Sequence, residues 1–351
     1  MNGNYMSAYQ NNNNDSKSSK PRINKYDNLR GLAILLVIFG HMIYPKYFEF
    51  SIVRDFVFLI DLPLLYFVSG FFSKTGPGEG KKAFKRILLP YIIFCIIDFF
   101  VDVYIYNKSP KMLFIYPGFG LWFLLALFFM KMSLPIFDKL KHPITISIIL
   151  FLLVGFLDIQ ANFLGITRFL KYLPIFLLGY CFKDYKSKLE ERISKRNIKW
   201  NNKYLLLIIG LIITLIAAYL IPYKIIAYSP PYASLDFKLS EQMIYRLSMV
   251  LVSMLAVLVL NNSMHNKNDL LTKLGKNSMA IYILHLYLYS PWIPVSEMIF
   301  TKFGPLASIS ASIIISLLIA LIFSRDIFTE IYNKLMDISY DFIMKIINLI
   351  K

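Results

Sequence analysis

The chain has 351 residues, of which 57% are apolar and only 17% are charged. Soluble proteins average about 45–50% apolar and about 25% charged residues, so this composition excludes a disordered chain and an ordinary soluble enzyme. The two cysteines lie in apolar stretches and exclude a disulfide framework or a cysteine zinc site. The formal net charge of +17 would favour nucleic acid as a partner of a soluble protein, so its distribution along the chain decides its meaning.

Residues 1–25 are polar, and we expect them to form a disordered cytoplasmic tail without a secretory signal. Apolar segments then recur, and most have the roughly 20 residues that cross a bilayer. They are apolar on all sides rather than alternating, which predicts helices rather than a barrel. The predicted fold is an all-α polytopic bundle with ten spans, at residues 29–45, 54–73, 87–106, 119–137, 144–160, 168–182, 204–221, 243–260, 274–292 and 305–324.

Lysine and arginine are distributed unevenly over the ends of these spans. With both termini inside, the inner segments hold 27 of these residues and the outer ones hold 9, while Arg30 and Arg246 lie within spans. The positive-inside rule therefore predicts cytoplasmic termini in a multi-pass protein of the plasma membrane. Topology and contact with anionic membrane lipids then explain the net charge, so nucleic acid is not expected as a partner.

The segment 325–351 differs from the transmembrane domain that we assign to residues 26–324. Its apolar residues recur at spacings of three and four, with charged residues between them, which predicts a cytoplasmic amphipathic helix. Such a helix would lie on the inner membrane face or pack on cytoplasmic loops, and the pattern alone favours neither. The apolar positions are Ile327, Ile331, Leu335, Ile338, Phe342, Ile346 and Leu349.

Ionisable residues within spans are costly, which makes them functional candidates. Arg30 and His41 are eleven residues apart. In a helix this is three turns plus about 20°, so both face the same way, roughly 16 Å apart along the axis. Asp27 can pair with Arg30, and the imidazole of His41 is suited to proton transfer. The simpler interpretation makes Arg30 a snorkelling anchor and His41 an interhelical hydrogen-bonding group.

Two further spans carry polar residues of interest. Asp61 stands close to Pro63 and could orient a histidine, unless it lies in water at the outer mouth of the bundle. Ser69 and Gly70 are predicted to allow close helix packing. His285 is the second histidine within a predicted span, near its mid-depth.

Other candidates lie near the ends of spans. Lys82, Lys85 and Arg86 precede the third span and either set topology or bind an anion at the cytoplasmic edge. Trp122 begins the fourth span as an interfacial aromatic residue or a substrate contact, and Arg168 begins the sixth.

Taken in order, these segments resemble the signature segments of acyltransferase family 3, a family of membrane proteins. The first is Arg30-x10-His41, and the whole pattern is closest to the fucose 4-O-acetylase-like branch. Two positions depart from it: Asp61 stands where that branch often has histidine, and Ala83 replaces the first arginine of an Arg-x-x-Arg pair that ends at Arg86. The later matching segments are residues 62–70, 85–91, 121–124, 173–180 and 277–285.

The resemblance implies an O-acetyltransferase that uses cytoplasmic acetyl-CoA as donor, without a metal. The acceptor would be a sugar hydroxyl of a cell-surface polysaccharide or its precursor. His41 would act as general base, oriented by Asp61, although a covalent acyl-enzyme on His41 is also open. The implied donor-binding residues are Arg30, Lys82, Lys85 and Arg86. The resemblance also implies that Trp122, Arg168 and His285 bind the substrate or relay a proton.

Two other classes of function fit the same residues. A transporter or flippase of glycans or small acids could use the buried charges as a conduction path, although no inverted repeat is visible. A non-catalytic scaffold would tolerate replacement of His41. The sequence is compatible with an oligomer and does not identify the acceptor sugar.

Overall fold

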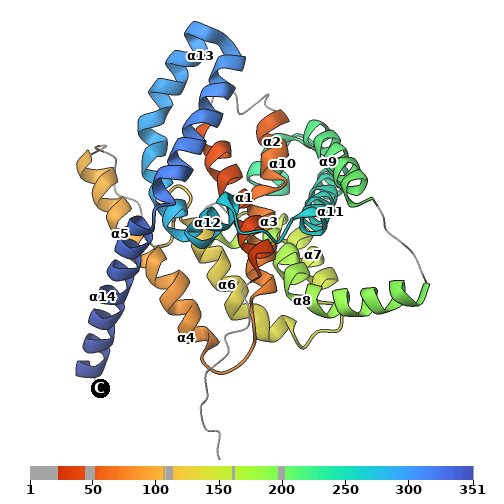
Figure 1. The fold of residues 1–351 in the computed structure, drawn as a ribbon, viewed down its shortest axis with the longest axis horizontal. Helices are drawn as coiled ribbons and strands as arrows, with labels where there is room; N and C mark the ends of the chain where they lie inside the picture. The colour runs from red at the N-terminus through yellow and green to blue at the C-terminus, as the bar shows by residue number, and fades with distance from the viewer. Residues whose placement is uncertain are drawn as a thin grey trace, which may run out of the picture.

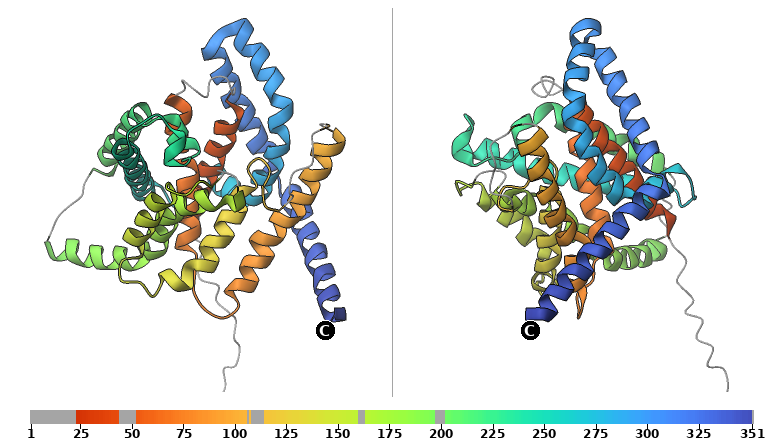
Figure 2. Two further views of the ribbon diagram at one scale, coloured as in Figure 1. Left: turned by 180° about the vertical axis from the view of Figure 1, so that it is seen from behind. Right: turned by 90° about the vertical axis from the view of Figure 1, so that its left-hand side faces the viewer.

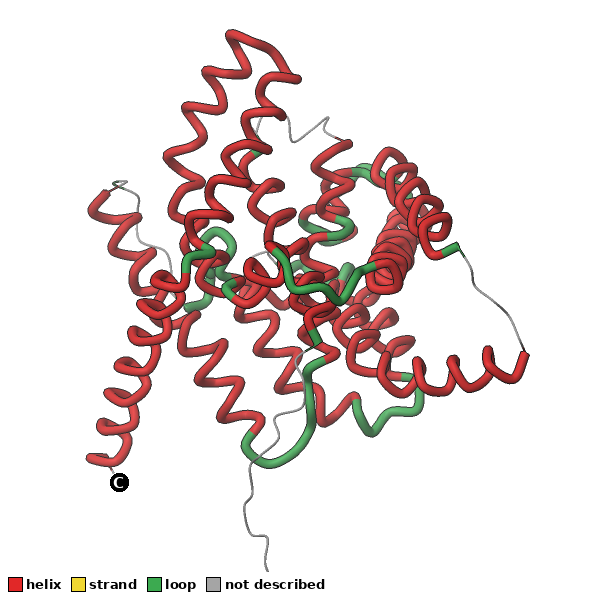
Figure 3. The backbone as a smooth tube through the Cα atoms, viewed as in Figure 1, coloured by secondary structure: helices red, strands yellow, loops and turns green. Residues whose placement is uncertain are grey.

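The computed structural model describes residues 23–43, 52–105, 107, 114–159, 163–196 and 202–350. Regular structure in these ranges is entirely helical (Figures 1 and 3). The helices form a central bundle from which a helical hairpin and the C-terminal helix project (Figures 1 and 2). The predicted tail at residues 1–25 falls almost entirely outside the described residues.

Most predicted spans coincide with one principal helix, and several are interrupted by short turns. The elements are α1 (Asn24–Met42), α2 (Ile52–Phe58), α3 (Asp61–Phe71), α4 (Glu79–Ala83), η2 (Phe84–Leu88), α5 (Leu89–Phe100), η3 (Val101–Ile105), α6 (Trp122–Phe137), α7 (Pro143–Val154), η4 (Phe163–Gly165), α8 (Ile166–Arg196), α9 (Lys203–Leu220), α10 (Tyr223–Ala227), η5 (Tyr232–Ser234), α11 (Leu239–Ser263), α12 (Leu270–Lys276), α13 (Ser278–Phe323) and α14 (Asp326–Ile350).

Five helical segments in the described ranges are long and apolar enough to cross a membrane. This confirms an all-helical membrane fold, whereas the number of ten spans and the orientation stay predictions. The helices α6 and α7 are apolar but shorter. The five segments are Glu79–Ile105, Phe163–Lys183, Lys203–Leu220, Leu239–Ser263 and Ser278–Phe323.

The longest helix, α13, holds two of the predicted spans and folds as a hairpin. Its 46 residues would extend about 69 Å if straight, more than twice the thickness of the hydrocarbon core. At Gly304 the backbone leaves the helical region, with φ +80° and ψ −176°. A positive φ suits glycine, and Pro305 then starts the second half because it needs no hydrogen bond at that position. The two halves rise together above the bundle (Figures 1 and 2).

The third predicted span begins with a widened turn, η2, just before Pro90. Proline has no N–H to donate to the carbonyl four residues earlier, which disturbs the regular ladder of an α-helix. The chain responds with a π-helical turn. This turn carries Lys85 and Arg86, so these side chains do not follow the directions of an ideal helix.

Two close helix crossings bring the central elements together. A side-chain Cβ at Gly70 would lie 1.9 Å from a backbone oxygen of α8, and one at Gly179 would lie 2.1 Å from a backbone oxygen of α3. The helices α1 and α12 meet in the same way through Gly31 and Gly275. Only glycine permits such backbone contact. The predicted packing role of Gly70 is therefore confirmed.

The first helix is fixed at both ends by the C-terminal part of the chain. Near its start, the Asn28 amide donates hydrogen bonds of 3.1 and 2.9 Å to two carbonyls in the segment 265–267. Near its end, Trp292 Nε1 and Ser312 Oγ donate to the Met42 carbonyl oxygen at 2.6 and 2.9 Å. These bonds hold His41, the residue before Met42, against α13.

The C-terminal helix α14 occupies the segment predicted to be amphipathic. Tyr332 stacks on Phe94 of α5 with ring centres 6.3 Å apart, and Met336 is buried. The apolar stripe of the prediction faces away from this contact, with Ile331 59% and Phe342 64% exposed. A helix is therefore present, and its place on a membrane surface stays a prediction.

Candidate active site

The two histidines of the predicted spans meet in the bundle. His41 Nδ1 of α1 lies 2.9 Å from His285 Nε2 of α13, and the rings are nearly parallel. His285 is fully buried, whereas His41 is partly exposed. His285 Nδ1 lies 3.2 Å from the carbonyl oxygen of Ile281. The sequence singled out both histidines, but not their direct contact.

These hydrogen bonds determine which ring nitrogens carry protons. A carbonyl can only accept, so His285 Nδ1 must donate its proton to Ile281. Nε2 of neutral His285 is then an acceptor, and His41 Nδ1 donates to it. This leaves the lone pair on His41 Nε2, which is the form that a general base requires.

Asp61, the predicted orienting group, makes no hydrogen bond to either histidine. Its Oδ1 accepts a hydrogen bond from the backbone N–H of Leu62 at 2.5 Å, and its charge acts on Lys171. His41 instead pairs with His285, whose Nε2 holds the imidazole. The expected carboxylate–histidine pair is therefore replaced by a histidine–histidine pair.

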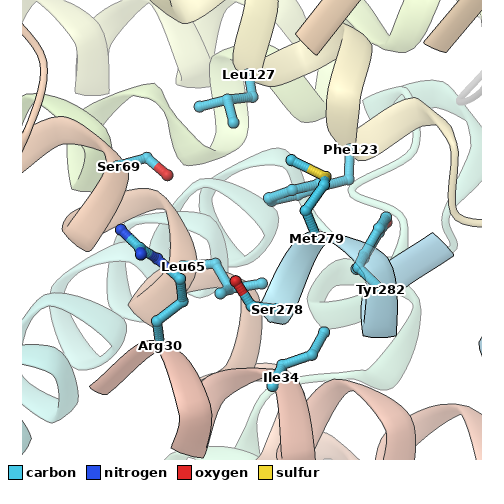
Figure 4. Close-up of a pocket in the computed structure, with 9 residues that line it drawn as sticks. All are labelled: Arg30, Ile34, Leu65, Ser69, Phe123, Leu127, Ser278, Met279 and Tyr282. Atoms are coloured by element: carbon cyan, nitrogen blue, oxygen red, sulfur yellow. The ribbon is translucent and has the colours of Figure 1, made fainter. Parts of the chain in front are cut away.

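A narrow cavity leads from Arg30 toward this pair. It has a volume of about 70 Å³, which is room for a few water molecules or a slender chain but not for a nucleotide. Figure 4 shows Arg30 beside Ser69 at one end and Tyr282 at the other. The Tyr282 ring stands edge-on to His285, with ring centres 5.5 Å apart. The remaining lining residues are Ile34, Leu65, Phe123, Leu127, Ser278 and Met279.

Arg30 lines the cavity, and two more cations, Arg86 and Lys131, act together with it. We call these three residues the Arg30 end. Arg30 forms the expected ion pair with Asp27, at 3.4 Å. The charges of Arg30 and Arg86 both act on Lys131 of α6, whose Nζ donates to Ser73 Oγ at 2.8 Å. Lys131 is not among the predicted site residues, because its position near the end of a span is typical of a topology determinant.

The other two predicted donor-binding residues turn away from this group. Lys82 pairs with Glu79 at 2.6 Å and is largely exposed. Lys85 pairs with Asp337 of α14 at 2.9 Å and lies over the ring of Tyr340. The structure thus brings Arg30 and Arg86 each within electrostatic range of Lys131 and directs both lysines toward carboxylates.

Arg168 and Trp122 lie at the other end of the same region. The Arg168 guanidinium lies over the Trp122 ring, with its central carbon 4.1 Å from the ring centre. From Trp122, a row of ring contacts leads to His285, with centre distances between 4.8 and 6.4 Å. The row therefore connects three residues predicted for substrate binding or relay. Its intermediate members are Tyr172, Tyr66, Phe123 and Tyr282.

The fold and these contacts define a class of protein: a helical membrane protein with a directly contacting histidine pair inside its bundle. The particular family follows from sequence comparison. The family model described as an acyltransferase domain matches residues 23–325, and the chain belongs to this family, acyltransferase family 3. None of the curated proteins and none of the solved structures matches the chain significantly. The fucose 4-O-acetylase-like branch stays a prediction.

Proposed function

We propose that this membrane acyltransferase is an O-acetyltransferase. It takes an acetyl group from acetyl-CoA at the Arg30 end and passes it to a sugar hydroxyl of a cell-surface polysaccharide or its precursor. The observation that carries this proposal is the 2.9 Å contact between His41 and His285, because it leaves the lone pair of His41 Nε2 available to accept a proton.

The chemistry needs one base and one group that stabilises its protonated form. As the acceptor oxygen attacks the thioester carbonyl, His41 Nε2 takes the hydroxyl proton. The new C–O bond forms, the C–S bond breaks, and the imidazolium returns the proton to the leaving sulfur. His285 stabilises the imidazolium by accepting from His41 Nδ1. A general base of this kind contributes about 10²–10⁴ in rate.

The proposed donor path is supported by charge and by shape. CoA carries several phosphate charges, and the Arg30 end offers three cations, of which Arg30 lines the cavity. Beyond them the cavity is narrow and mainly apolar, which suits the pantetheine arm better than the nucleotide. Arg30 and His41 are eleven residues apart in one helix, so a thioester at His41 would lie roughly 16 Å from the charged end.

The test uses purified protein in lipid nanodiscs with labelled acetyl-CoA and candidate glycans. His41→Ala should lower acetyl transfer by about 10²–10⁴ and leave CoA binding unchanged. His142→Ala is the matched control, because His142 is exposed at the start of α7. Near-normal turnover in His41→Ala would contradict the proposal, and glycan movement without acetyl-CoA would support a transporter instead.

A further inference from the structure

Three cationic side chains lie buried in the bundle away from the Arg30 end. Arg168 is 8% exposed, Lys171 is 2% exposed and Arg246 is 0% exposed. We call these three residues the Arg168 cluster. Among the described residues, Asp61 is the one carboxylate whose charge acts on any of them, and it makes no direct ion pair. A buried charge without a partner is strongly unfavourable.

The hydrogen bonds of the cluster leave several donors unused. Lys171 Nζ donates to the Ile226 carbonyl, and one Arg246 nitrogen donates to the Pro230 carbonyl. The other two Arg246 nitrogens, Nε and Nη1, have no partner in the described part of the chain. Arg168 makes no hydrogen bond or ion pair there, and its buried Nε is unsatisfied.

Aromatic rings stacked on Arg168 and Arg246 do not occupy their unused N–H donors. Trp122 covers one face of the Arg168 guanidinium and Tyr232 one face of Arg246, at 4.1 and 4.3 Å. The N–H donors lie in the guanidinium plane, so a ring on its face leaves them available. Donors so arranged match the two oxygens of a carboxylate or phosphate.

The same bundle also holds a buried arginine that has a carboxylate partner. Arg54 of α2 is fully buried and pairs with its neighbour Asp55 at 2.5 Å. Its guanidinium also lies over Tyr223. Arg168 and Arg246 have the ring but not the carboxylate, which indicates that their anion comes from outside the chain.

The Arg168 cluster borders the histidine pair. The charges of Arg168 and Asp61 both act on Tyr282, whose ring contacts His285. The cluster is also far from the donor end, because Trp122 precedes Lys131 by nine residues of α6, about 13 Å. An anion held here would be close to the reacting hydroxyl and separate from the phosphates of CoA.

We propose that the Arg168 cluster binds an anionic group of the acceptor, so that the acceptor is an acidic saccharide carrying a carboxylate or a phosphate. This inference rests on the proposed function, because it takes the bound saccharide to be the acceptor of the acetyl group. Arg168 supplies two donors to the anion, Arg246 and Lys171 supply further positive charge, and Trp122 offers a ring on which a sugar can stack.

Binding is measured without acetyl-CoA, so the result stands apart from the outcome of the acetyl-transfer assay. The nanodisc protein is titrated with methyl glucuronide, glucose 1-phosphate and the neutral methyl glucoside. At least one anionic probe should bind ten-fold or more tightly than the neutral one. The first two probes also show whether the group is a carboxylate or a phosphate. Equal or undetectable binding of all three overturns the proposal.

Two variants test the role of Arg168 itself. Arg168→Gln should abolish the preference for the anionic probe, and Arg168→Lys should restore only part of it. Lys302→Gln is the matched control, because Lys302 is exposed on the α13 hairpin. Without ligand, Arg168→Gln should melt at the same temperature as the wild type or higher, because an unpaired buried charge has been removed. An unchanged preference, or a large loss of stability, shows that Arg168 is structural.

Discussion

The Arg30 end and the Arg168 cluster each collect three cations, but they hold them in different ways. At the Arg30 end, Arg86 is exposed, Arg30 is partly exposed and paired with Asp27, and Lys131 bonds to a hydroxyl. In the Arg168 cluster the cations are buried and the two arginines lack an ion pair. Exposed cations can serve topology alone, because water solvates them. Buried cations need an anionic partner, and the two arginines of the Arg168 cluster have none in the described part of the chain, so the Arg168 cluster is the stronger indicator of a binding site.

The largest effect is expected at the histidine pair. Replacing His285 by Leu removes the acceptor of His41 Nδ1, so neither the tautomer nor the imidazolium is stabilised. Acetyl transfer should fall by about 10²-fold or more. His285→Gln should be milder, since its amide oxygen can still accept. The measurement is the turnover rate at saturating acetyl-CoA, and equal rates for both variants would show that the contact is only packing.

The free energy of unfolding should distinguish a buried arginine that has a carboxylate partner from one that has none. Arg54→Gln leaves Asp55 buried without its partner and should lower the free energy of unfolding by about 3–5 kcal/mol. Arg168→Gln leaves no carboxylate behind and removes an unpaired buried charge, so it should leave the free energy of unfolding unchanged or raise it. Thermal melting of both variants in the same detergent makes the comparison. A greater loss in Arg168→Gln would reverse the assignment of structural and ligand-binding arginine.

Donor affinity should respond only to the Arg30 end. Each charge-assisted hydrogen bond contributes about 1.5–3 kcal/mol, so Arg30→Ala and Lys131→Gln should each weaken CoA binding by roughly ten-fold or more. Titration of CoA into each variant tests this. The Arg168→Gln variant should bind CoA normally, and a loss there would merge the two cation groups into one site.

The smallest effect is expected for the lysines that turn away from the cavity. Lys85 pairs with Asp337 and Lys82 with Glu79 at the surface, where water and salt screen ion pairs. Lys82→Ala and Lys85→Ala should therefore change CoA affinity less than about five-fold. The same titration measures it, and a loss as large as that of Arg30→Ala would return both lysines to the donor site.

The sequence predicted the helical membrane fold and the close packing at Gly70, because apolar runs and small residues depend on local pattern alone. It also identified Arg30, His41 and His285 as polar residues placed in apolar surroundings. Periodicity could not show that His41 meets His285, 244 residues away, since this contact depends on how α1 packs on α13.

The contacts of three other polar residues also depend on how distant helices pack, so the sequence could not predict them. A carboxylate near a predicted site suggests a partner for histidine, yet the packing of α3 on α8 brings the charge of Asp61 into range of Lys171. Lys131 was indistinguishable from other basic residues at the ends of spans until Arg30 and Arg86 were found near it. Arg246 was recognised as lying within a span, but only the structure shows that two of its nitrogens lack partners.

The central claim is that donor and acceptor reach one histidine pair from opposite ends of the bundle. Proteoliposomes with acetyl-CoA only outside and an acidic saccharide only in the lumen test it directly. Protein molecules whose Arg30 end faces outward should release CoA outside and accumulate acetylated saccharide in the lumen, and His41→Ala vesicles should not. Acetylation that requires both substrates on the same side of the membrane would contradict the account.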